Sequence, residues 1–134
     1  MGFWNKKEGA TKAEDINWEF LNTEEALLNL VEKSMDKPQV IFKHSTTCSI
    51  SAMAKRRLER QWNIDETLAD IHYLDLLSYR DLSNKVATDL GVTHQSPQVI
   101  IIKNGQAVYN TSHNDISVAT IDEEIRKEHD ILRK

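Results

Sequence analysis

The run from Val99 to Ile102 constrains the fold more than any other stretch of this 134-residue chain. It consists of β-branched residues only, which are typical of strands, and Asn104-Gly105 follows after a single lysine. Asn-Gly is the strongest two-residue hairpin signal, because both positions tolerate a positive φ. We therefore expect a strand that ends in a tight turn and returns as an antiparallel partner over residues 107–111.

Patterns of apolar residues divide the rest of the chain into strands and helices. Trp18 and Phe20 alternate with polar residues, as in a strand with one buried face, whereas Leu27 and Leu30 recur at helical spacing. The expected elements are a strand at 16–20, a helix capped by Asn22 or Thr23 that ends before Pro38, a strand at 40–42, a helix from Cys48 to Trp62, a strand at 71–76, a helix over 82–90 ended by Gly91, the hairpin, and a helix capped by Asp115 or Ser117 with Ile121, Ile125 and Leu132 on its apolar side.

This order, β-α-β-α-β-α-β-β-α, predicts an α/β fold. Parallel strands in the first half need helical crossovers, and the second half closes with an antiparallel hairpin and a helix. We expect a central mixed five-stranded sheet flanked by four helices, in one domain at residues 16–134, after a flexible polar tail at residues 1–15.

Charged residues in two of these segments also receive a prediction. The polar stretch that follows the strand at 40–42 is expected to begin at Lys43. The basic residues of the second helix are expected to lie mostly away from its apolar side and to face water. They are Lys55, Arg56, Arg57 and Arg60.

Composition and charge narrow the class of protein. Hydrophobic residues make up 40% and charged residues 28%, which suits one soluble domain. A net charge of -4 argues against a general nucleic-acid binder, which would present a basic face. The sequence has neither the apolar segment of a signal peptide nor the ~20 apolar residues that span a bilayer. A single cysteine excludes an internal disulfide and favours the cytoplasm.

Cys48 is the candidate reactive residue, because it falls where a buried strand passes into a helix. A helix N-terminus offers free N–H groups and a partial positive charge, which favour the thiolate, the species that attacks a disulfide. A buried structural cysteine is the alternative, but the neighbouring hydroxyl residues make the setting polar. They are Thr46, Thr47, Ser49 and Ser51.

Two side chains near Cys48 are candidates to stabilise its thiolate, together with Thr47 and Ser49. Ser51 follows three residues later, which places it on the same helix face. Its hydroxyl either donates to the thiolate or only supports the first helical turn, and the spacing leaves both open. His44 precedes Cys48 by four residues, although a histidine at a strand end is the simpler interpretation.

Ser96-Pro97 stands just before the strand at 99–102. A proline at the start of a strand costs little and needs no functional explanation. A cis peptide bond would expose the Ser96 backbone to a disulfide partner, but only ~5–6% of X–Pro bonds in folded proteins are cis. The remaining histidines show no ligand spacing with the cysteine, so a zinc site made by protein residues alone is not expected. They are His72, His94, His113 and His129.

The run from Phe42 to Ser51 (Phe-Lys-His-Ser-Thr-Thr-Cys-Ser-Ile-Ser) closely resembles the YtxJ-like monothiol bacilliredoxins, which carry one active cysteine in a Thr-Cys-x-Ile-Ser motif. The run Ser96-Pro97-Gln98, followed by a strand, an Asn-Gly turn and a strand, is similar as well. The resemblance covers roughly residues 20–130 and implies a thioredoxin-like fold.

The resemblance also implies an activity, namely thiol-disulfide exchange that removes bacillithiol, or a similar low-molecular-weight thiol, from mixed disulfides on cytosolic proteins. Cys48 would be the nucleophile that retains the thiol, and a second bacillithiol would release it. Pro97 would be a cis-proline, and Ser96 would offer backbone hydrogen bonds to the thiol. A helix N-terminus with His113 and Asp115 would receive the malate carboxylates of bacillithiol, although a helix cap alone is the simpler interpretation.

The implied partners are S-thiolated client proteins and the external thiol, which is a co-substrate and not a bound cofactor. Neither nucleic acid nor a membrane is expected as a partner, and the chain is expected to be a monomer. The alternative is a non-enzymatic thioredoxin-like adapter, or an iron–sulfur carrier that uses Cys48 with an external thiol. Two departures from glutaredoxins bear on it: Ser49-Ile50 replaces the Gly-Phe of their cluster-binding members, and Lys43 lies farther from the cysteine than their thiol-binding lysine.

Overall fold

The structure, a computed structural model, describes residues 16–127. The expected tail at 1–15 and the expected apolar position Leu132 lie outside the described residues. The described elements follow the expected order, with one short 3-10 helix added. They are β2 (Trp18–Phe20), α1 (Glu24–Lys33), β3 (Gln39–His44), α2 (Ser49–Gln61), β4 (Asp70–Asp75), α3 (Arg80–Leu90), β5 (Gln98–Lys103), β6 (Gln106–Ser112), the 3-10 helix η2 (His113–Asp115) and α4 (Val118–Arg126).

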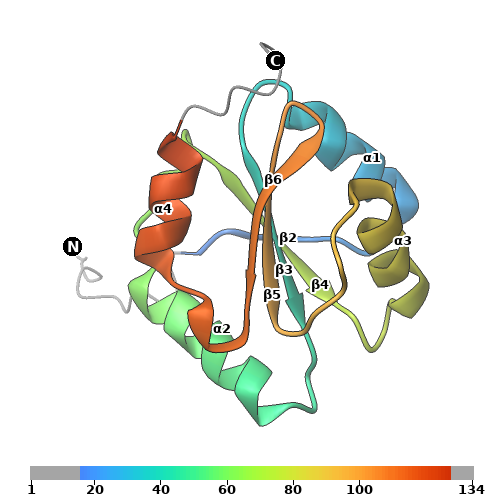
Figure 1. Cartoon of the computed structure of the whole chain (residues 1–134), viewed down its shortest axis with the longest axis vertical. Helices are drawn as coiled ribbons and strands as arrows, with labels where there is room; N and C mark the ends of the chain where they lie inside the picture. Colours follow the sequence, from blue (N-terminus) through green and yellow to red (C-terminus); the bar gives the residue numbers. More distant parts are fainter. Residues whose placement is uncertain (1–15, 128–134) are drawn as a thin grey trace, which may run out of the picture.

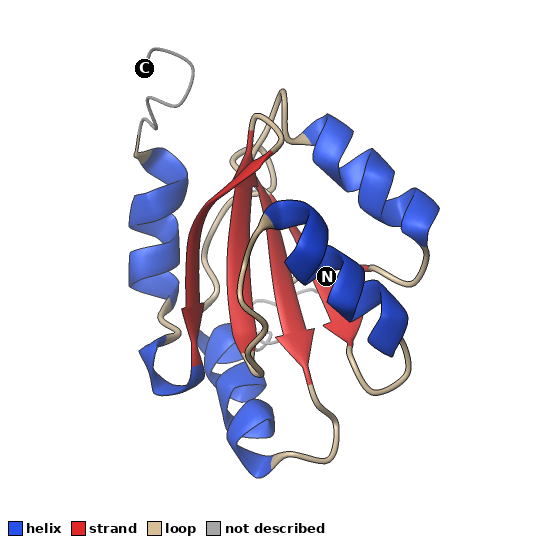
Figure 2. Cartoon of the chain, turned by 45° about the vertical axis from the view of Figure 1, so that its right-hand side comes forward, coloured by secondary structure: helices blue, strands red, loops and turns tan. Residues whose placement is uncertain are grey.

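A single mixed sheet separates two layers of helices. Its strand order is β2-β4-β3-β5-β6. Strands β2, β4 and β3 run parallel, while β5 is antiparallel to β3 and to β6. Helices α2 and α4 cover one face, and α1 and α3 cover the other (Figure 1). Figure 2 shows the strands between these layers. The predicted α/β fold with a mixed five-stranded sheet is therefore confirmed.

Each face of the sheet has its own apolar core, which explains why the central strands are apolar at nearly every position. Alternate residues of β3 and β5 point to opposite faces, so Phe42 packs toward α2 and α4 while Ile41 packs toward α1 and α3. The first core includes Val40, Leu58, Val99, Ile101 and Ile121, and the second includes Leu30, Val86, Ile100 and Ile102.

The strand register brings three connections to one end of the sheet. Lys43 near the end of β3 pairs with Gln98 at the start of β5, and Gln98 in turn pairs with Ser112 at the end of β6. The loop before α2, the segment before β5 and the turn after β6 therefore all lie at the same end of the sheet. This end is formed by the carboxyl ends of the parallel strands, where α/β proteins commonly bind ligands.

Local sequence signals set most element ends. The Thr23 hydroxyl accepts the Ala26 N–H at 3.0 Å and caps α1, and Ser117 caps α4 in the same way. Gly91 ends α3 at φ +66°, and the 104–105 turn has positive φ at both residues. Of the alternatives Asn22 and Thr23, Thr23 caps α1. Of the alternatives Asp115 and Ser117, Ser117 caps α4, and Asp115 lies in η2.

The prediction that a polar stretch begins at Lys43 is wrong. Strand β3 continues through His44, and Lys43 pairs with Leu74 of β4 and Gln98 of β5. Its side chain is 0% exposed and reaches toward α3. The sheet ladder on both sides, which a local pattern does not reveal, holds this lysine inside the fold.

Candidate active site

Cys48 lies at the N-cap of α2, at the end of the sheet where the loop before α2, the segment before β5 and the turn after β6 lie. Its carbonyl accepts the N–H of Ala52 at 3.0 Å, which starts the helix, and its own N–H donates to the carbonyl of Ser45 at 3.2 Å. The side chain is partly exposed and makes no capping hydrogen bond. Cys48 is therefore partly exposed at the end of α2 that carries the positive end of the helix dipole.

Ser51 and His44 lie against each other below the cysteine loop. The Ser51 Oγ is 2.7 Å from Nδ1 of His44, and it also accepts the N–H of Ser45 at 3.0 Å. Both side chains are buried, with exposed fractions of 0% and 5%. The Ser51 hydroxyl thus joins the end of β3 to the first turn of α2. Whether either residue stabilises the thiolate stays a prediction.

The surroundings of His44 are mainly aromatic. Its ring lies 5.7 Å from that of Phe42 and 5.6 Å from that of Tyr73. Burial lowers the pKa of His44 below its ordinary value, and the positive charge of Lys55 lowers it further, whereas Asp75 and Glu59 oppose both effects. The neutral imidazole is therefore favoured at neutral pH, and it suits the hydrogen bond with Ser51 as donor or as acceptor.

Thr47 and Ser49 flank Cys48 and are both exposed. Thr47 belongs to the loop after β3, and Ser49 is the first residue of α2. Both hydroxyls lie in the same short segment as the thiol. Their predicted part in stabilising the thiolate stays a prediction.

Ser96 and Pro97 lie directly before β5, at the same end of the sheet as Cys48, and the peptide bond between them is cis. Pro97 is buried, and its carbonyl accepts the N–H of His113 at 3.0 Å. The Ser96 Oγ is buried, and among the described residues it has no hydrogen-bond partner. The sequence spacing left the isomer open, and the fold around this segment determines it.

His113 and Asp115 occupy η2, directly after β6, and both are exposed. His113 adopts a left-handed backbone with φ +56°, which is uncommon for a residue other than glycine. The hydrogen bond to the Pro97 carbonyl connects this turn to the cis-proline segment. The pairing of β5 with β6 therefore brings Pro97 and His113 together.

Arg57 is a residue whose role the sequence pattern missed. It is partly exposed, as a residue on the water-facing side would be, but its guanidinium also donates to the backbone carbonyls of the turn after β6. The Nη2 atom lies 3.1 Å from the Ile116 carbonyl oxygen and 3.3 Å from that of His113, and Nε lies 3.3 Å from that of Ile116. No local signal marks these partners, since they lie more than fifty residues away in the chain.

Lys43 points away from Cys48, into the opposite core. Its Nζ lies 3.2 Å from the Ser83 carbonyl oxygen and 3.2 Å from Nδ1 of His94. Burial lowers the pKa of Lys43 from 10.5 to about 8. This lysine therefore does not take the position of a thiol-binding residue on the accessible side of the site.

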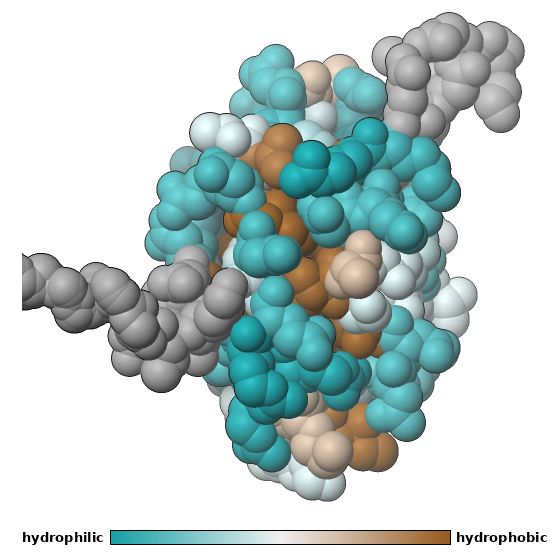
Figure 3. Space-filling view, turned by 90° about the vertical axis from the view of Figure 1, so that its left-hand side faces the viewer, coloured by the Kyte–Doolittle hydropathy of each residue, from teal (hydrophilic) through white to brown (hydrophobic). Residues whose placement is uncertain are grey.

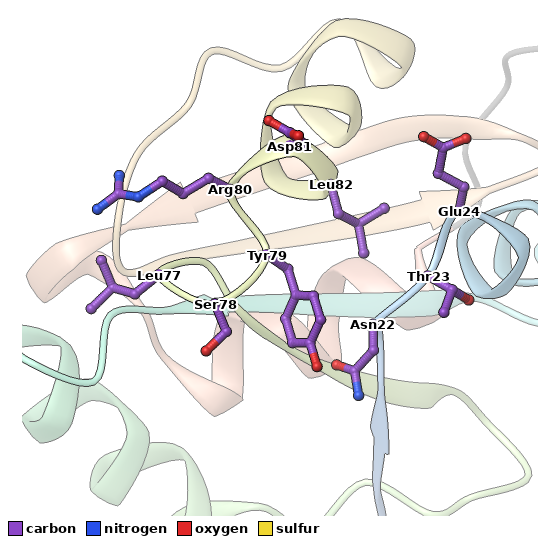
Figure 4. A pocket seen from close by; sticks show the side chains of 9 residues that line it. All are labelled: Asn22, Thr23, Glu24, Leu77, Ser78, Tyr79, Arg80, Asp81 and Leu82. Atoms are coloured by element: carbon purple, nitrogen blue, oxygen red, sulfur yellow. The ribbon is translucent and has the colours of Figure 1, made fainter.

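A separate pocket of about 450 Å³ lies at the N-terminal ends of α1 and α3. Asn22 and Thr23 line it on one side, and residues 77–82 line it on the other. In Figure 4 the side chains of Tyr79 and Asn22 point toward one another across this pocket. Cys48 does not line it, so we treat it as distinct from the candidate active site.

Within residues 16–127, no group of three or more His, Cys, Asp or Glu residues is arranged to hold a metal ion. No helix within this range is long and apolar enough to cross a membrane.

Comparison with known proteins links this geometry to a family. The family profile described as "Monothiol bacilliredoxin BrxC" matches residues 19–121. A solved structure described as an oxidoreductase candidate with a thioredoxin fold has 30% identity and a TM-score of 0.66, over 83% of this chain and 95% of its own. Thioredoxin from Trypanosoma brucei brucei has 16% identity and a TM-score of 0.65, over 88% and 93% of the two chains. Thioredoxin from Malassezia sympodialis has 16% identity and a TM-score of 0.63, over 79% and 85%. The two thioredoxins share the fold.

Proposed function

The chain belongs to the monothiol bacilliredoxin family, and from this we propose that it removes bacillithiol, or a similar low-molecular-weight thiol, from mixed disulfides on cytosolic client proteins. The observation that carries the proposal is the position of Cys48, a partly exposed thiol at the N-cap of a thirteen-residue helix. Reactive cysteines in proteins often lie at helix N-termini, and the thiolate is the attacking species in disulfide exchange.

The proposed reaction has two exchange steps. In the first, the Cys48 thiolate attacks the bacillithiol sulfur of the client's mixed disulfide, so that a Cys48–bacillithiol disulfide forms and the client leaves as a thiolate. In the second, a free bacillithiol thiolate attacks the bacillithiol sulfur bound to Cys48. This releases the Cys48 thiolate and oxidised bacillithiol. Each step forms one disulfide and breaks one, and the external thiol supplies the electrons.

The second step follows from the cysteine count. Cys48 is the single cysteine of the chain, so no second thiol within the chain can resolve the mixed disulfide. Ser51 occupies the position three residues later, and its hydroxyl, which contacts His44 and Ser45, cannot form a disulfide. A thiol from solution is therefore the proposed resolving group.

The proposed binding site for the retained thiol lies between Cys48, Pro97 and the turn at His113. The backbone of Ser96 is proposed to hydrogen-bond the thiol moiety. The side chain of His113, which is exposed in that turn, is proposed to meet its carboxylates, with Asp115 at the border of the site. The hydrogen bond from the His113 N–H to the Pro97 carbonyl supports this grouping, because it holds two of the segments together.

Apolar side chains next to Cys48 support a protein as the client. Ile50 and Met53 lie on the first turns of α2 and are 50% and 56% exposed. Figure 3 views the side of the molecule that carries α2 and α4, where hydrophilic side chains predominate and hydrophobic ones reach the surface between them. Exposed apolar residues beside a reactive thiol suit contact with a partner protein.

The test uses a purified client protein that carries bacillithiol on one cysteine. With bacillithiol as reductant, the wild-type protein is expected to release the modification, and Cys48→Ser is expected to release none. Mass spectrometry of the wild type with limiting reductant should show bacillithiol bound to Cys48. Gln61→Ala, which changes an exposed residue at the far end of α2, is the control and is expected to stay active. Equal release by wild type and Cys48→Ser contradicts the proposal.

A further inference from the structure

Arg57 joins the helix that carries Cys48 to the turn after β6. One guanidinium donates to two backbone carbonyls, those of His113 and Ile116, at 3.1 to 3.3 Å. A charged donor makes stronger hydrogen bonds than a neutral one, and the planar guanidinium fixes its acceptors in direction as well as distance. Arg57 therefore determines where this turn lies relative to α2.

The same turn is also bonded to the segment directly before β5. The N–H of His113 donates to the Pro97 carbonyl at 3.0 Å, while the His113 carbonyl accepts from Arg57. His113 has φ +56°, an uncommon conformation for a residue with a side chain. Its N–H and its carbonyl are both hydrogen-bonded, to Pro97 and to Arg57 respectively.

These contacts connect the segments around the proposed exchange site to one another. Helix α2 joins Cys48 to Arg57, and hydrogen bonds join Arg57 to His113 and His113 to Pro97. Strand β5, which follows Pro97, pairs with β3, which leads to the loop before Cys48. Arg57 lies nine residues after Cys48, which is roughly 13 Å along a helix axis. It therefore acts on the site through the turn and not by touching the thiol.

We propose that Arg57 is a positioning residue for thiol exchange, which holds the turn at His113 and the segment at Pro97 at a fixed spacing from Cys48. This inference rests on the proposed function, because it assigns the turn to binding of the retained anionic thiol. Loss of the guanidinium frees the turn and weakens binding of the thiolated substrate. Cys48 keeps its reactivity, because Arg57 bonds to the turn and not to the thiol.

The test compares three variants of the full chain. Arg57→Met keeps the aliphatic stem and removes the donors. Arg57→Lys keeps the positive charge but replaces the planar guanidinium with one ammonium group. Arg56→Met removes the same charge from an exposed neighbouring position and is the matched control. The substrate is a peptide with bacillithiol on its one cysteine, turned over with excess bacillithiol. A second, independent readout is the rate of amide hydrogen exchange at His113.

For Arg57→Met we expect about a tenfold rise in KM for the peptide with kcat within about twofold of wild type. Hydrogen exchange at His113 should become faster, and the rate of Cys48 alkylation by iodoacetamide should not change. Arg57→Lys should restore part of the loss, and it carries the test if the methionine variant does not fold. Arg56→Met should match wild type in KM and in exchange at His113.

Two results overturn the inference. One is a wild-type KM and a wild-type exchange rate in Arg57→Met, and the other is an equal loss in Arg56→Met. A wild-type protein that does not turn over the peptide contradicts the proposed function instead. In that case faster exchange at His113 in Arg57→Met still supports the contact made by Arg57, and unchanged exchange still refutes it.

Discussion

The Oγ of Ser51 lies 2.7 Å from Nδ1 of His44, and both groups are buried beneath the loop that carries Cys48. Ser51 also accepts the N–H of Ser45. Its one hydroxyl therefore satisfies a buried imidazole and a loop amide together. The position three residues after the cysteine serves here as a link between β3 and α2.

Replacement of Ser51 by alanine is expected to destabilise the protein. The change leaves the His44 Nδ1 and the Ser45 N–H without their partner, and an unsatisfied buried polar group costs about 1–3 kcal/mol. Urea denaturation of Ser51→Ala should show a loss in that range. Ser49→Ala, two residues earlier and exposed, should unfold like wild type. Equal stability of the two variants would contradict the assigned link.

Ile50 and Met53 are expected to contribute to recognition of protein clients. Changing both to serine removes exposed apolar surface next to Cys48 and should lower kcat/KM for a thiolated protein by about tenfold. A thiolated tripeptide, which is too short to cover these residues, should react at the wild-type rate. The control changes Leu28 and Met35 to serine, because they are similarly exposed but belong to α1 and the segment after it. An equal loss of kcat/KM with the tripeptide would contradict the prediction, because it would show that the substitutions impair thiol exchange itself and not client recognition.

Lys43 is expected to make stability depend on pH in the alkaline range. Burial lowers its pKa from 10.5 to about 8, so the charged form is disfavoured in the folded protein by roughly 3 kcal/mol. Below pH 8 both states are charged and this cost is fully present. Between pH 8 and 10.5 the unfolded state binds more protons, so the free energy of unfolding rises with pH.

The variant Lys43→Met isolates this effect. It should be more stable than wild type at pH 7, and its advantage should shrink toward pH 9.5 as Lys43 becomes neutral in the folded wild type. Urea denaturation of both proteins at several pH values gives the difference. Lys85→Met, at a half-exposed position of α3, is the control, and its difference from wild type should stay constant over this range. A constant difference for Lys43→Met would refute the prediction.

His72 is expected to weaken the fold in acid. It lies buried with Nε2 2.7 Å from the Gln39 side-chain oxygen, and burial lowers its pKa from 6.5 to about 4, against an opposing effect of Glu19. The neutral ring is favoured in the folded state, so stability is full above pH 6.5 and falls as the pH drops toward 4, by up to about 3 kcal/mol. His72→Gln should lose less stability than wild type between pH 7 and 4.5. Parallel denaturation curves at the two pH values provide the check.

The elements and their order could be predicted from the sequence because they depend on local physics. The β-branched run at 99–102, the Asn104-Gly105 turn and the left-handed Gly91 act through φ/ψ preferences that neighbouring residues alone determine. Cys48 could be placed at a strand–helix junction for the same reason. For α1 and α4, two nearby polar residues were possible caps, and the structure shows Thr23 and Ser117 in that role.

The partners inside the candidate site could not be predicted, because they come from distant parts of the chain. The Arg57 guanidinium meets carbonyls at His113 and Ile116, across separations that periodicity does not encode. The spacing also left Ser51 equally suited to the thiol and to the backbone. The contact between Ser51 and His44 at the end of β3 comes from the fold, and a role of Ser51 toward the thiol stays a prediction.

The sequence by itself determined that this chain forms an α/β fold with one thiol at a helix start. Hydrophobic periodicity, turn residues and a single cysteine suffice for that, since each acts over a few residues. The tertiary structure alone decided that Lys43 is buried, that Ser51 bonds His44 and that Arg57 holds the turn after β6. A side chain finds its partner only when the strands are in register and the helices are packed. These contacts are therefore a property of the assembled sheet and not of any local segment.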